Sequence, residues 1–273
     1  MKSIVVSGSF EDLRAGQVRF LQEAARLGEV TVLLWPDEEV RRVCGARPRI
    51  PGVERLYQLG SIQYVQQVLF TQNAIERDAL PFAEEAEPEI WIVPEDEDSY
   101  QKRLFCASTG LGYHVIRNIE LLGWPGDVST ANPGMGHKKK GVVSGAFELL
   151  LPGDVNFLEE ASQFGELHVV VANDVNVRWL LGSGHPFGSQ DERRYMVQSI
   201  RYVQQAVIGS GSGWMDAGPE IELLQPDIYI VDEDGDRIEK RDYCEKRGIE
   251  YVVLKRRTDP GILRQGSAES GGF

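Results

Sequence analysis

The chain has no surplus of positive charge and no apolar run long enough to cross a membrane. Its 29 Lys and Arg are outnumbered by 42 Asp and Glu, which gives a formal net charge of −13 at pH 7. A surface of that sign argues against a protein that tracks nucleic-acid backbones or anionic lipid. Spanning a bilayer takes about 20 consecutive apolar residues, and none of the runs approaches that length. We therefore expect neither a nucleic acid nor a membrane as a partner.

Cysteine is scarce, with three residues in 273. Cys44, Cys106 and Cys244 show neither the spacing of a metal site nor an even framework for disulfides, so we expect no resident metal. Cys106 and Cys244 fall within amphipathic patterns and are predicted to be buried thiols. The chain starts with Met1-Lys2 and a short strand pattern that does not fit a signal peptide, and we expect a cytoplasmic protein.

What the chain does contain is one pattern written twice. Two copies of this length are too few for a solenoid and too long for one supersecondary unit, so they predict a tandem duplication of a whole domain. The expected domains are residues 1–132 and 133–273, joined by a turn-rich linker near residues 123–140. The clearest matches are residues 5–11 with 142–148, 16–21 with 153–158, 64–67 with 202–205, and 88–93 with 226–231.

Each copy alternates short apolar runs with longer amphipathic patterns. Strands that are apolar on both faces, separated by helices, are typical of a parallel sheet covered on both sides. The sequence therefore predicts an α/β protein with two tandem domains of this kind. Expected strands in the first copy are residues 3–7, 30–34, 68–70, 90–93 and 113–116, and those of the second copy are 141–144, 167–172, 206–208, 228–231 and 251–254.

The loop after the first strand of each copy is the expected ligand site. In open parallel sheets, ligands bind beyond the carboxyl ends of the strands. This loop also leads into a helix, whose first backbone amides attract phosphate. The loops are residues 7–17 in the first copy and 144–154 in the second.

These two loops resemble the signature G-x-F-D-x-x-H-x-G-H of the cytidylyltransferase-like nucleotidyltransferase family. The nearest types adenylylate heptose 1-phosphate or cytidylylate glycerol 3-phosphate. The resemblance covers nearly the whole chain, twice, and includes the turn at residues 45–48 and the strand at 226–231. It implies two tandem Rossmann-like (HUP-type) domains. It also implies ATP or CTP with Mg²⁺, and a small phosphorylated sugar or alcohol as the nucleotidyl acceptor, with release of pyrophosphate.

Both copies depart from the signature at its two histidines. Arg14 and Gln17 replace them in the first copy, and Leu151 and Asp154 in the second. Nucleotidyl transfer depends mainly on positioning and electrostatic stabilisation, and Arg14 and Gln17 can both donate to phosphate. They are the expected catalytic residues. Leu151 has no donor and Asp154 repels phosphate, so the second copy is expected to be degenerate and empty.

The resemblance also implies further site residues in the first copy. The family's aspartate is replaced by Glu11, with Glu148 at the same position in the second copy. A linker cap for Ser129-Thr130, a surface turn for Arg47 and a solvated helix start for Arg55 remain open alternatives. The implied nucleotide-binding residues are Gly8, Ser9, Phe10, Glu11, Gly16, Ser129 and Thr130, and the implied substrate-binding residues are Arg47 and Arg55.

Three functions fit these observations. The first is a divergent nucleotidyltransferase with its site in the first copy. The second is a pseudoenzyme that binds a nucleotide or a partner without chemistry. The third is a structural protein that uses the repeated fold as a rigid platform. Single-domain relatives usually pair as homodimers, so the two copies are expected to form an internal pseudo-dimer, and further homo-oligomerisation is left open.

Overall fold

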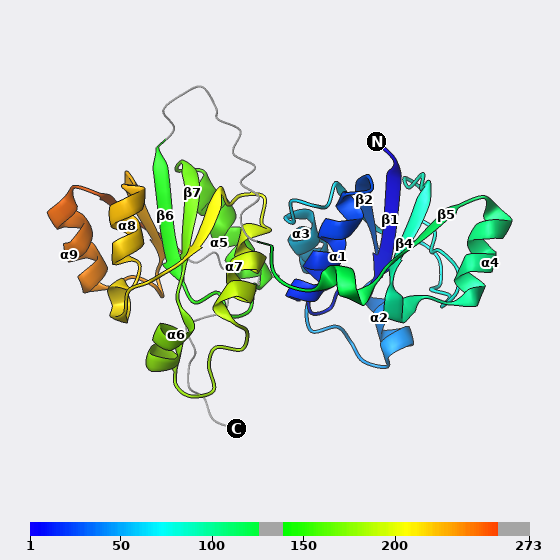
Figure 1. Ribbon diagram of the computed structural model, residues 1–273, viewed down its shortest axis with the longest axis horizontal. Coiled ribbons are helices and arrows are strands. Elements are labelled where there is room, and N and C mark those ends of the chain that lie inside the picture. Colours follow the sequence, from blue (N-terminus) through cyan, green and yellow to red (C-terminus); the bar gives the residue numbers. More distant parts are fainter. Residues whose placement is uncertain (126–138, 256–273) are drawn as a thin grey trace. The chain divides into compact units, whose positions relative to one another are not determined.

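The computed structural model describes residues 1–125 and 139–255. The chain divides into two compact units, Met1–Gly123 and Trp124–Phe273, which we call the first and second domains. Figure 1 shows the described elements of each. The expected boundary between residues 132 and 133 lies outside the described residues.

The first domain is built on a five-stranded sheet in which every described pairing is parallel. The strand order is β3-β2-β1-β4-β5, with β1 in the centre. Val5 and Val6 of β1 are buried on opposite faces, as expected of a strand covered on both sides. The strands are β1 (Ser3–Gly8), β2 (Glu29–Leu34), β3 (Gln67–Phe70), β4 (Ile90–Pro94) and β5 (Gly112–Ile116).

The second domain has a parallel sheet of the same topology. Its order is β8-β7-β6-β9-β10, which places β6 where β1 lies in the first domain. The two sheets confirm the predicted α/β class with two tandem Rossmann-like domains. The strands are β6 (Lys140–Gly145), β7 (Glu166–Val171), β8 (Gln205–Ile208), β9 (Ile228–Asp232) and β10 (Glu250–Leu254).

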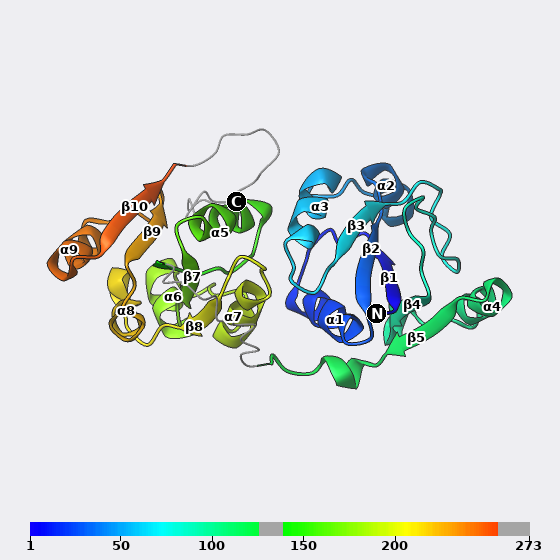
Figure 2. The ribbon, with the colours of Figure 1, turned by 90° about the horizontal axis from the view of Figure 1, so that it is seen from above.

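Helices cover both faces of each sheet. Parallel strands are joined by right-handed crossovers, so connections that run in opposite directions along the sheet put their helices on opposite faces. Figure 1 shows α5 and α7 on one side of the second sheet and α8 and α9 on the other. Figure 2 shows α1 and α4 on opposite sides of the first. In the part of the chain that the structure describes, no helix is both long and apolar enough to cross a membrane. The helices are α1 (Ala15–Ala25), α2 (Asp37–Cys44), α3 (Gly52–Gly60), α4 (Tyr100–Thr109), α5 (Pro152–Ser162), α6 (Asp174–Leu181), α7 (Gln190–Gln198), α8 (Gly218–Leu224) and α9 (Ile238–Arg247).

Gly28 has a different role from the one its sequence position indicates. The pattern predicts that it caps the first helix, but α1 ends at Ala25 with Arg26 as its C-cap. A Cβ on Gly28 would lie 2.2 Å from the carbonyl oxygen of Lys2, and one on the equivalent Gly165 would lie 2.0 Å from that of Lys139. Glycine is needed at both positions because the central strand's first residues pass this close to the start of the next strand.

The two cysteines at equivalent positions are buried, as predicted. Cys106 lies on the buried face of α4, where it packs with Val5, Leu33 and Trp91, and it is 2% exposed. Cys244 occupies the equivalent position on α9 and is fully buried. Burial raises the pKa of the Cys244 thiol to about 11, so it stays protonated and acts as a small apolar side chain.

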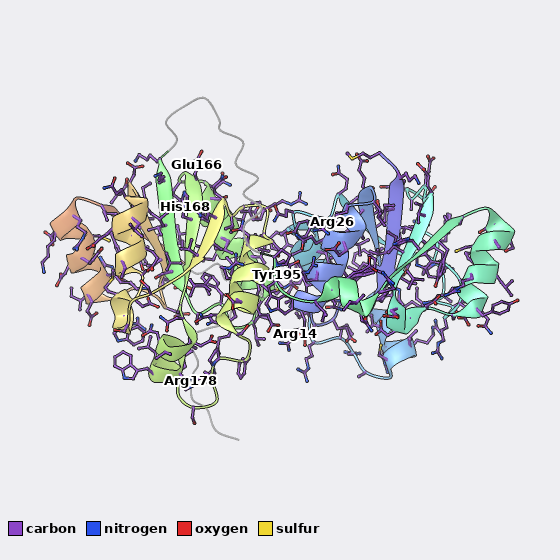
Figure 3. All side chains as sticks on the ribbon, in the orientation of Figure 1. Arg14, Arg26, Glu166, His168, Arg178 and Tyr195 are labelled. Atoms are coloured by element: carbon purple, nitrogen blue, oxygen red, sulfur yellow. The ribbon has the colours of Figure 1, made fainter. Side chains whose placement is uncertain are left out.

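His168 on β7 is predicted to make the second domain sensitive to acid (Figure 3). Its side chain is 9% exposed, and neither ring nitrogen has a well-aligned hydrogen-bond partner among the described residues. Burial and then the charge of Lys140 lower the pKa of His168 below its ordinary value of 6.5. The unfolded chain therefore binds the proton more readily, so stability is lost as pH falls below about 6.5.

Thermal unfolding of the wild type and of His168→Gln measures this effect. Between about pH 7.5 and pH 5.5, the wild type should lose more stability than the variant, because the variant lacks the titrating ring. Each unit of pKa difference contributes about 1.4 kcal/mol. Equal pH dependence in the two proteins would show that His168 does not carry the effect.

Candidate functional site

The loop that follows the central strand has the same strained backbone in both domains. Phe10 has a φ of 46° and Phe147 a φ of 47°, a left-handed conformation that bulky residues rarely adopt. A Cβ on Gly8 would lie 3.1 Å from the ring of Phe10, and one on Gly145 would lie 3.1 Å from that of Phe147. The absence of a side chain on the glycine thus leaves room for the phenylalanine ring.

At the start of α1, the side chain of Gln17, which replaces the second histidine of the family signature, caps the helix. Arg14 is the N-cap residue, and its backbone N–H donates to Oε1 of Gln17 over 3.1 Å. In the second domain, the backbone N–H of Leu151 donates to Oδ2 of Asp154 over 2.8 Å. The side chains of Gln17 and Asp154 thus each accept a hydrogen bond from the first residue of their own helix cap. For Gln17, this bond uses the carbonyl oxygen and leaves the amide NH₂ as the group that can donate to a ligand.

The Arg14 side chain lies where the loop joins α1, in contact with Asp12. Its Nε and Nη2 atoms are 2.8 Å and 2.6 Å from the same carboxylate oxygen. Both side chains are more than half exposed, at 53% and 62%. Exposed ion pairs of this kind contribute about 0–1 kcal/mol, so the Arg14 guanidinium can exchange Asp12 for a ligand phosphate at little energetic cost.

Arg55 on α3 is a buried support for the loop. Its guanidinium donates to the carbonyl oxygen of Ser9, to Trp35 O at 3.1 Å and to Ile50 O at 3.0 Å, and it pairs with Asp37 Oδ1 at 2.6 Å. The side chain is fully buried. A substrate contact by Arg55 would therefore require one of these protein bonds to be exchanged.

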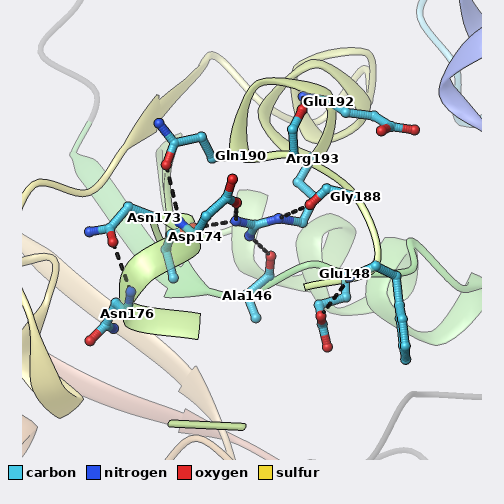
Figure 4. A network of polar contacts seen from close by, with 12 residues as sticks. Ala146, Glu148, Asn173, Asp174, Asn176, Gly188, Gln190, Glu192 and Arg193 are labelled. Atoms are coloured by element: carbon cyan, nitrogen blue, oxygen red, sulfur yellow. Dashed lines mark hydrogen bonds and ion pairs between the residues drawn. The ribbon is translucent and has the colours of Figure 1, made fainter. Parts of the chain in front are cut away.

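Arg193 on α7 forms the same network in the second domain, which Figure 4 shows. It donates to the carbonyl oxygen of Ala146 in the loop, to Ala172 O at 2.7 Å and to Gly188 O at 3.2 Å, and it pairs with Asp174 Oδ1 at 2.9 Å. We call Arg55 and Arg193, with their four acceptors each, the arginine hubs. Each hub links three separate segments at the carboxyl end of its sheet.

Glu148, at the position of the family's aspartate, holds a second loop over the site of the second domain. Its carboxylate accepts from Nδ1 of His185 at 2.7 Å and from the backbone N–H of Phe187 at 3.1 Å. In the first domain, Glu11 lies next to Cys44, where burial and the Glu11 carboxylate raise the pKa of the thiol. Glu11 thus contacts the last residue of α2, and Glu148 contacts the segment that follows α6.

The remaining expected site residues make fewer contacts or lie outside the described residues. Arg47 is exposed in the turn between α2 and α3, and Gly16 is exposed in the first turn of α1. Ser129 and Thr130 lie outside the described residues. The structure therefore brings Gly8, Ser9, Phe10, Glu11, Arg14, Gly16 and Gln17 together at one loop and helix start, with Arg55 beneath it.

The second domain contains a cavity of about 270 Å³ at the carboxyl end of its sheet. The signature loop forms one wall, with Phe147 and Asp154 among its lining residues. The segment from β9 to α9 forms another wall, which includes Lys240. In the described residues, no group of three or more His, Cys, Asp or Glu side chains is arranged to hold a metal ion.

The arginine hubs and the cavity residue Lys240 were not recognised as such from the sequence. The hubs had a usable signal, because both copies retain an aspartate after the second strand and an arginine that opens a later helix, Asp37 with Arg55 and Asp174 with Arg193. Lys240 had a weaker one, since Lys102 occupies the same position in the first copy. Only the fold shows that their surroundings differ.

Comparison with known proteins finds several archaeal enzymes but no matching family model. FAD synthase of Aciduliprofundum boonei is 38% identical over 117 residues, which cover 42% of this chain and 75% of that protein. FAD synthase of Methanopyrus kandleri is 33% identical over 123 residues, 43% of this chain and 79% of its own. The lipopolysaccharide core biosynthesis protein from Thermoplasma volcanium aligns over 44% of this chain and 97% of its own, with 24% identity and a TM-score of 0.37, too low to support any inference.

Two Rossmann-like domains, each with a nucleotidyltransferase-type loop after its central strand, define the class of protein. The similarity to FAD synthases extends over about three quarters of their length. The chain belongs to the cytidylyltransferase-like nucleotidyltransferase family.

Proposed function

We propose that the first domain transfers a nucleotidyl group from ATP or CTP to a small phosphorylated sugar or alcohol and releases pyrophosphate. The observation that carries this proposal is the position of Arg14, a permanent cation at the N-cap of α1 and at the carboxyl end of β1. Similarity to relatives named FAD synthase supports ATP rather than CTP as the nucleotide of this chain, and adenylyl transfer as its reaction type.

In this proposal, the start of α1 and Arg14 hold the triphosphate together. The first backbone N–H groups of the helix face the phosphates, and the helix dipole favours their negative charge. Arg14 leaves Asp12 and donates to the phosphate oxygens on which charge builds during attack. Gln17 contributes its amide NH₂ from the first turn of the helix, as a weaker neutral donor.

Magnesium fits this site as an ion held mainly by the nucleotide. Mg²⁺ is commonly bound by one or two carboxylates together with substrate phosphates, and Glu11 and Asp12 are the carboxylates of this loop. When bound, the ion would neutralise charge on the phosphates. Glu11 and Asp12 would hold it against the loop, while Arg14 and Gln17 approach the phosphates from the helix.

A second candidate function is nucleotide binding without transfer. It is favoured by the capping role of Gln17 and Asp154, whose side chains are engaged with their own helix starts where the family has histidine. A pseudoenzyme of this kind would retain the loop, the hub and the helix start. It would lack the donors that stabilise the transition state.

One experiment separates the two candidates. The full chain is titrated with ATP and with CTP, each with Mg²⁺, by calorimetry, and pyrophosphate release is followed with FMN, glycerol 3-phosphate and a hexose 1-phosphate as acceptors. We expect ATP to bind and pyrophosphate to form with one acceptor. Binding with no pyrophosphate from any acceptor would favour the pseudoenzyme. Failure of both nucleotides to bind would contradict both functions.

A further inference from the structure

The cavity of the second domain has an unusual set of charges for a nucleotide site. Acidic side chains outnumber cationic ones along its lining, which disfavours a ligand with several negative charges. Most of the acidic groups are already engaged by protein donors. The acidic lining residues are Glu148, Asp154, Asp216, Asp232 and Asp234, and the basic ones are His185, Arg237 and Lys240. Donors to the acids include His185 Nδ1 and Phe187 N for Glu148, Leu151 N for Asp154, Asn176 Nδ2 for Asp216, and Gly235 N for Asp232.

Lys240 is a buried cation that lacks a hydrogen-bonded partner in the described protein. The residue is only 7% exposed, yet it lines the cavity. Its ammonium lies 5.7 Å from the ring centre of Tyr229 and donates no hydrogen bond to any described atom. The carboxylates of Asp216, Asp232 and Asp236 favour its charge, but none accepts a hydrogen bond from it, so the ammonium can still gain an acceptor from a ligand.

The equivalent lysine in the first domain has the partner that Lys240 lacks. Lys102 is 6% exposed and lies 5.3 Å from the ring centre of Trp91. Its Nζ donates to the carbonyl oxygen of Glu97 at 2.9 Å, with the Glu97 carboxylate 3.7 Å away. The lysine is present in both domains, but only in the first does a described protein atom accept a hydrogen bond from it.

The size of the cavity limits the ligand. Sites for drug-sized molecules commonly enclose about 300–1,000 Å³, and this cavity of about 270 Å³ lies just below that range. Trp214 and Arg237 form part of the wall, with the guanidinium 4.7 Å from the ring centre. A small molecule fits this space better than a nucleoside triphosphate.

We propose that this cavity binds a small molecule that carries one oxyanion group, a phosphate or a carboxylate, seated on Lys240. Hydroxyl groups on the same molecule would donate to the carboxylates of Asp154, Asp232 and Asp234. Burial lowers the pKa of Lys240, and a bound oxyanion would raise it again, because an opposite charge favours the ammonium form. The proposal concerns the second domain and does not depend on nucleotidyl transfer in the first.

Three matched probes test the proposal. Glycerol 3-phosphate, glycerate and glycerol share a hydroxylated three-carbon skeleton and differ in carrying a phosphate, a carboxylate or no charge. Each is titrated into the full chain by calorimetry. We expect one of the two anions to bind with a Kd of about 1 mM or tighter, and glycerol not to bind. The anion that binds identifies the oxyanion, and binding of neither anion would overturn the proposal.

Three lysine variants locate the binding site. Lys240→Met keeps the length and the apolar stem of the side chain and should weaken anion binding on the order of 10- to 100-fold, because it removes a buried charge-assisted hydrogen bond. Lys102→Met is the control in the first domain and should leave the affinity unchanged. Lys240→Arg should restore part of the binding. If both proteins fold normally, equal anion affinities in the wild type and in Lys240→Met would overturn the assignment of the site to Lys240.

The same variants keep this proposal separate from the proposed function. Lys240→Met should leave nucleotide binding and pyrophosphate release in the first domain unchanged. Loss of anion binding with intact pyrophosphate release would support two independent sites. Anion binding that is lost in Lys102→Met and retained in Lys240→Met would place the anion in the first domain and overturn the proposal.

Discussion

Arg193→Met should destabilise the second domain by about 3–5 kcal/mol, the range seen when one partner of a buried ion pair is removed. The Arg193 side chain is 2% exposed, and it donates to three carbonyl oxygens and to Asp174. Methionine fills much of the same volume but offers no donor. The carbonyl oxygens of Ala146 and Ala172, the second of them buried, would then be left without this donor.

Hydrogen exchange can localise this loss, because two domains need not unfold in one transition. Backbone amides of β6 and β7 should exchange faster in Arg193→Met, while those of β1 and β2 keep their wild-type rates. Arg178→Met, at an exposed position on α6, removes the same charge and should change stability by less than about 0.5 kcal/mol. A loss in Arg193→Met no larger than in Arg178→Met would show that the hub does not hold the fold.

Arg14→Ala should lower nucleotidyl transfer by a factor on the order of 100 to 1,000, the typical cost of one lost transition-state donor. Arg14 carries the permanent charge at the start of α1, and its ion pair with Asp12 is exposed and weak. The measurement is kcat/KM for pyrophosphate release with the best acceptor. Gln17→Ala should cost less, since a neutral donor interacts more weakly with a developing anion.

Arg26→Ala is the matched control for Arg14→Ala. Arg26 is 65% exposed at the opposite end of α1, about 18 Å away along the helix, and it pairs with Glu23 (Figure 3). Its loss should leave kcat/KM near the wild-type value, as should changes at Leu151 and Asp154 in the second domain. Transfer that survives Arg14→Ala would mean that the chemistry lies elsewhere in the protein.

Strand positions could be predicted from the sequence because buried parallel strands are short apolar runs between turn residues. The predicted strands at residues 90–93 and 228–231 match β4 and β9 closely. The helix α2 was missed because its sequence is mostly charged, and only Val40 of its residues is buried. A helix with one buried side chain gives no apolar periodicity to detect.

The loss of the signature histidines was visible in the sequence, but the contacts of their replacements were not. The cap at Arg14 lacks the serine or threonine that usually marks a capping box, so the bond from Arg14 N to Gln17 could not be anticipated. Lys102 and Lys240 are alike in sequence, and their difference lies in the segments that approach them. Such differences depend on loop conformation, which residue spacing does not determine.

The arginine hubs separate the shape of each loop from its chemistry. Arg55 and Arg193 each donate only to backbone carbonyl oxygens and to one aspartate. These bonds therefore hold the backbone of the loop in place whatever side chains the loop carries. Side chains in the loop can therefore be exchanged with little effect on where its backbone runs. A fold anchored in this way allows two tandem copies of a domain to keep one framework while they acquire different ligands.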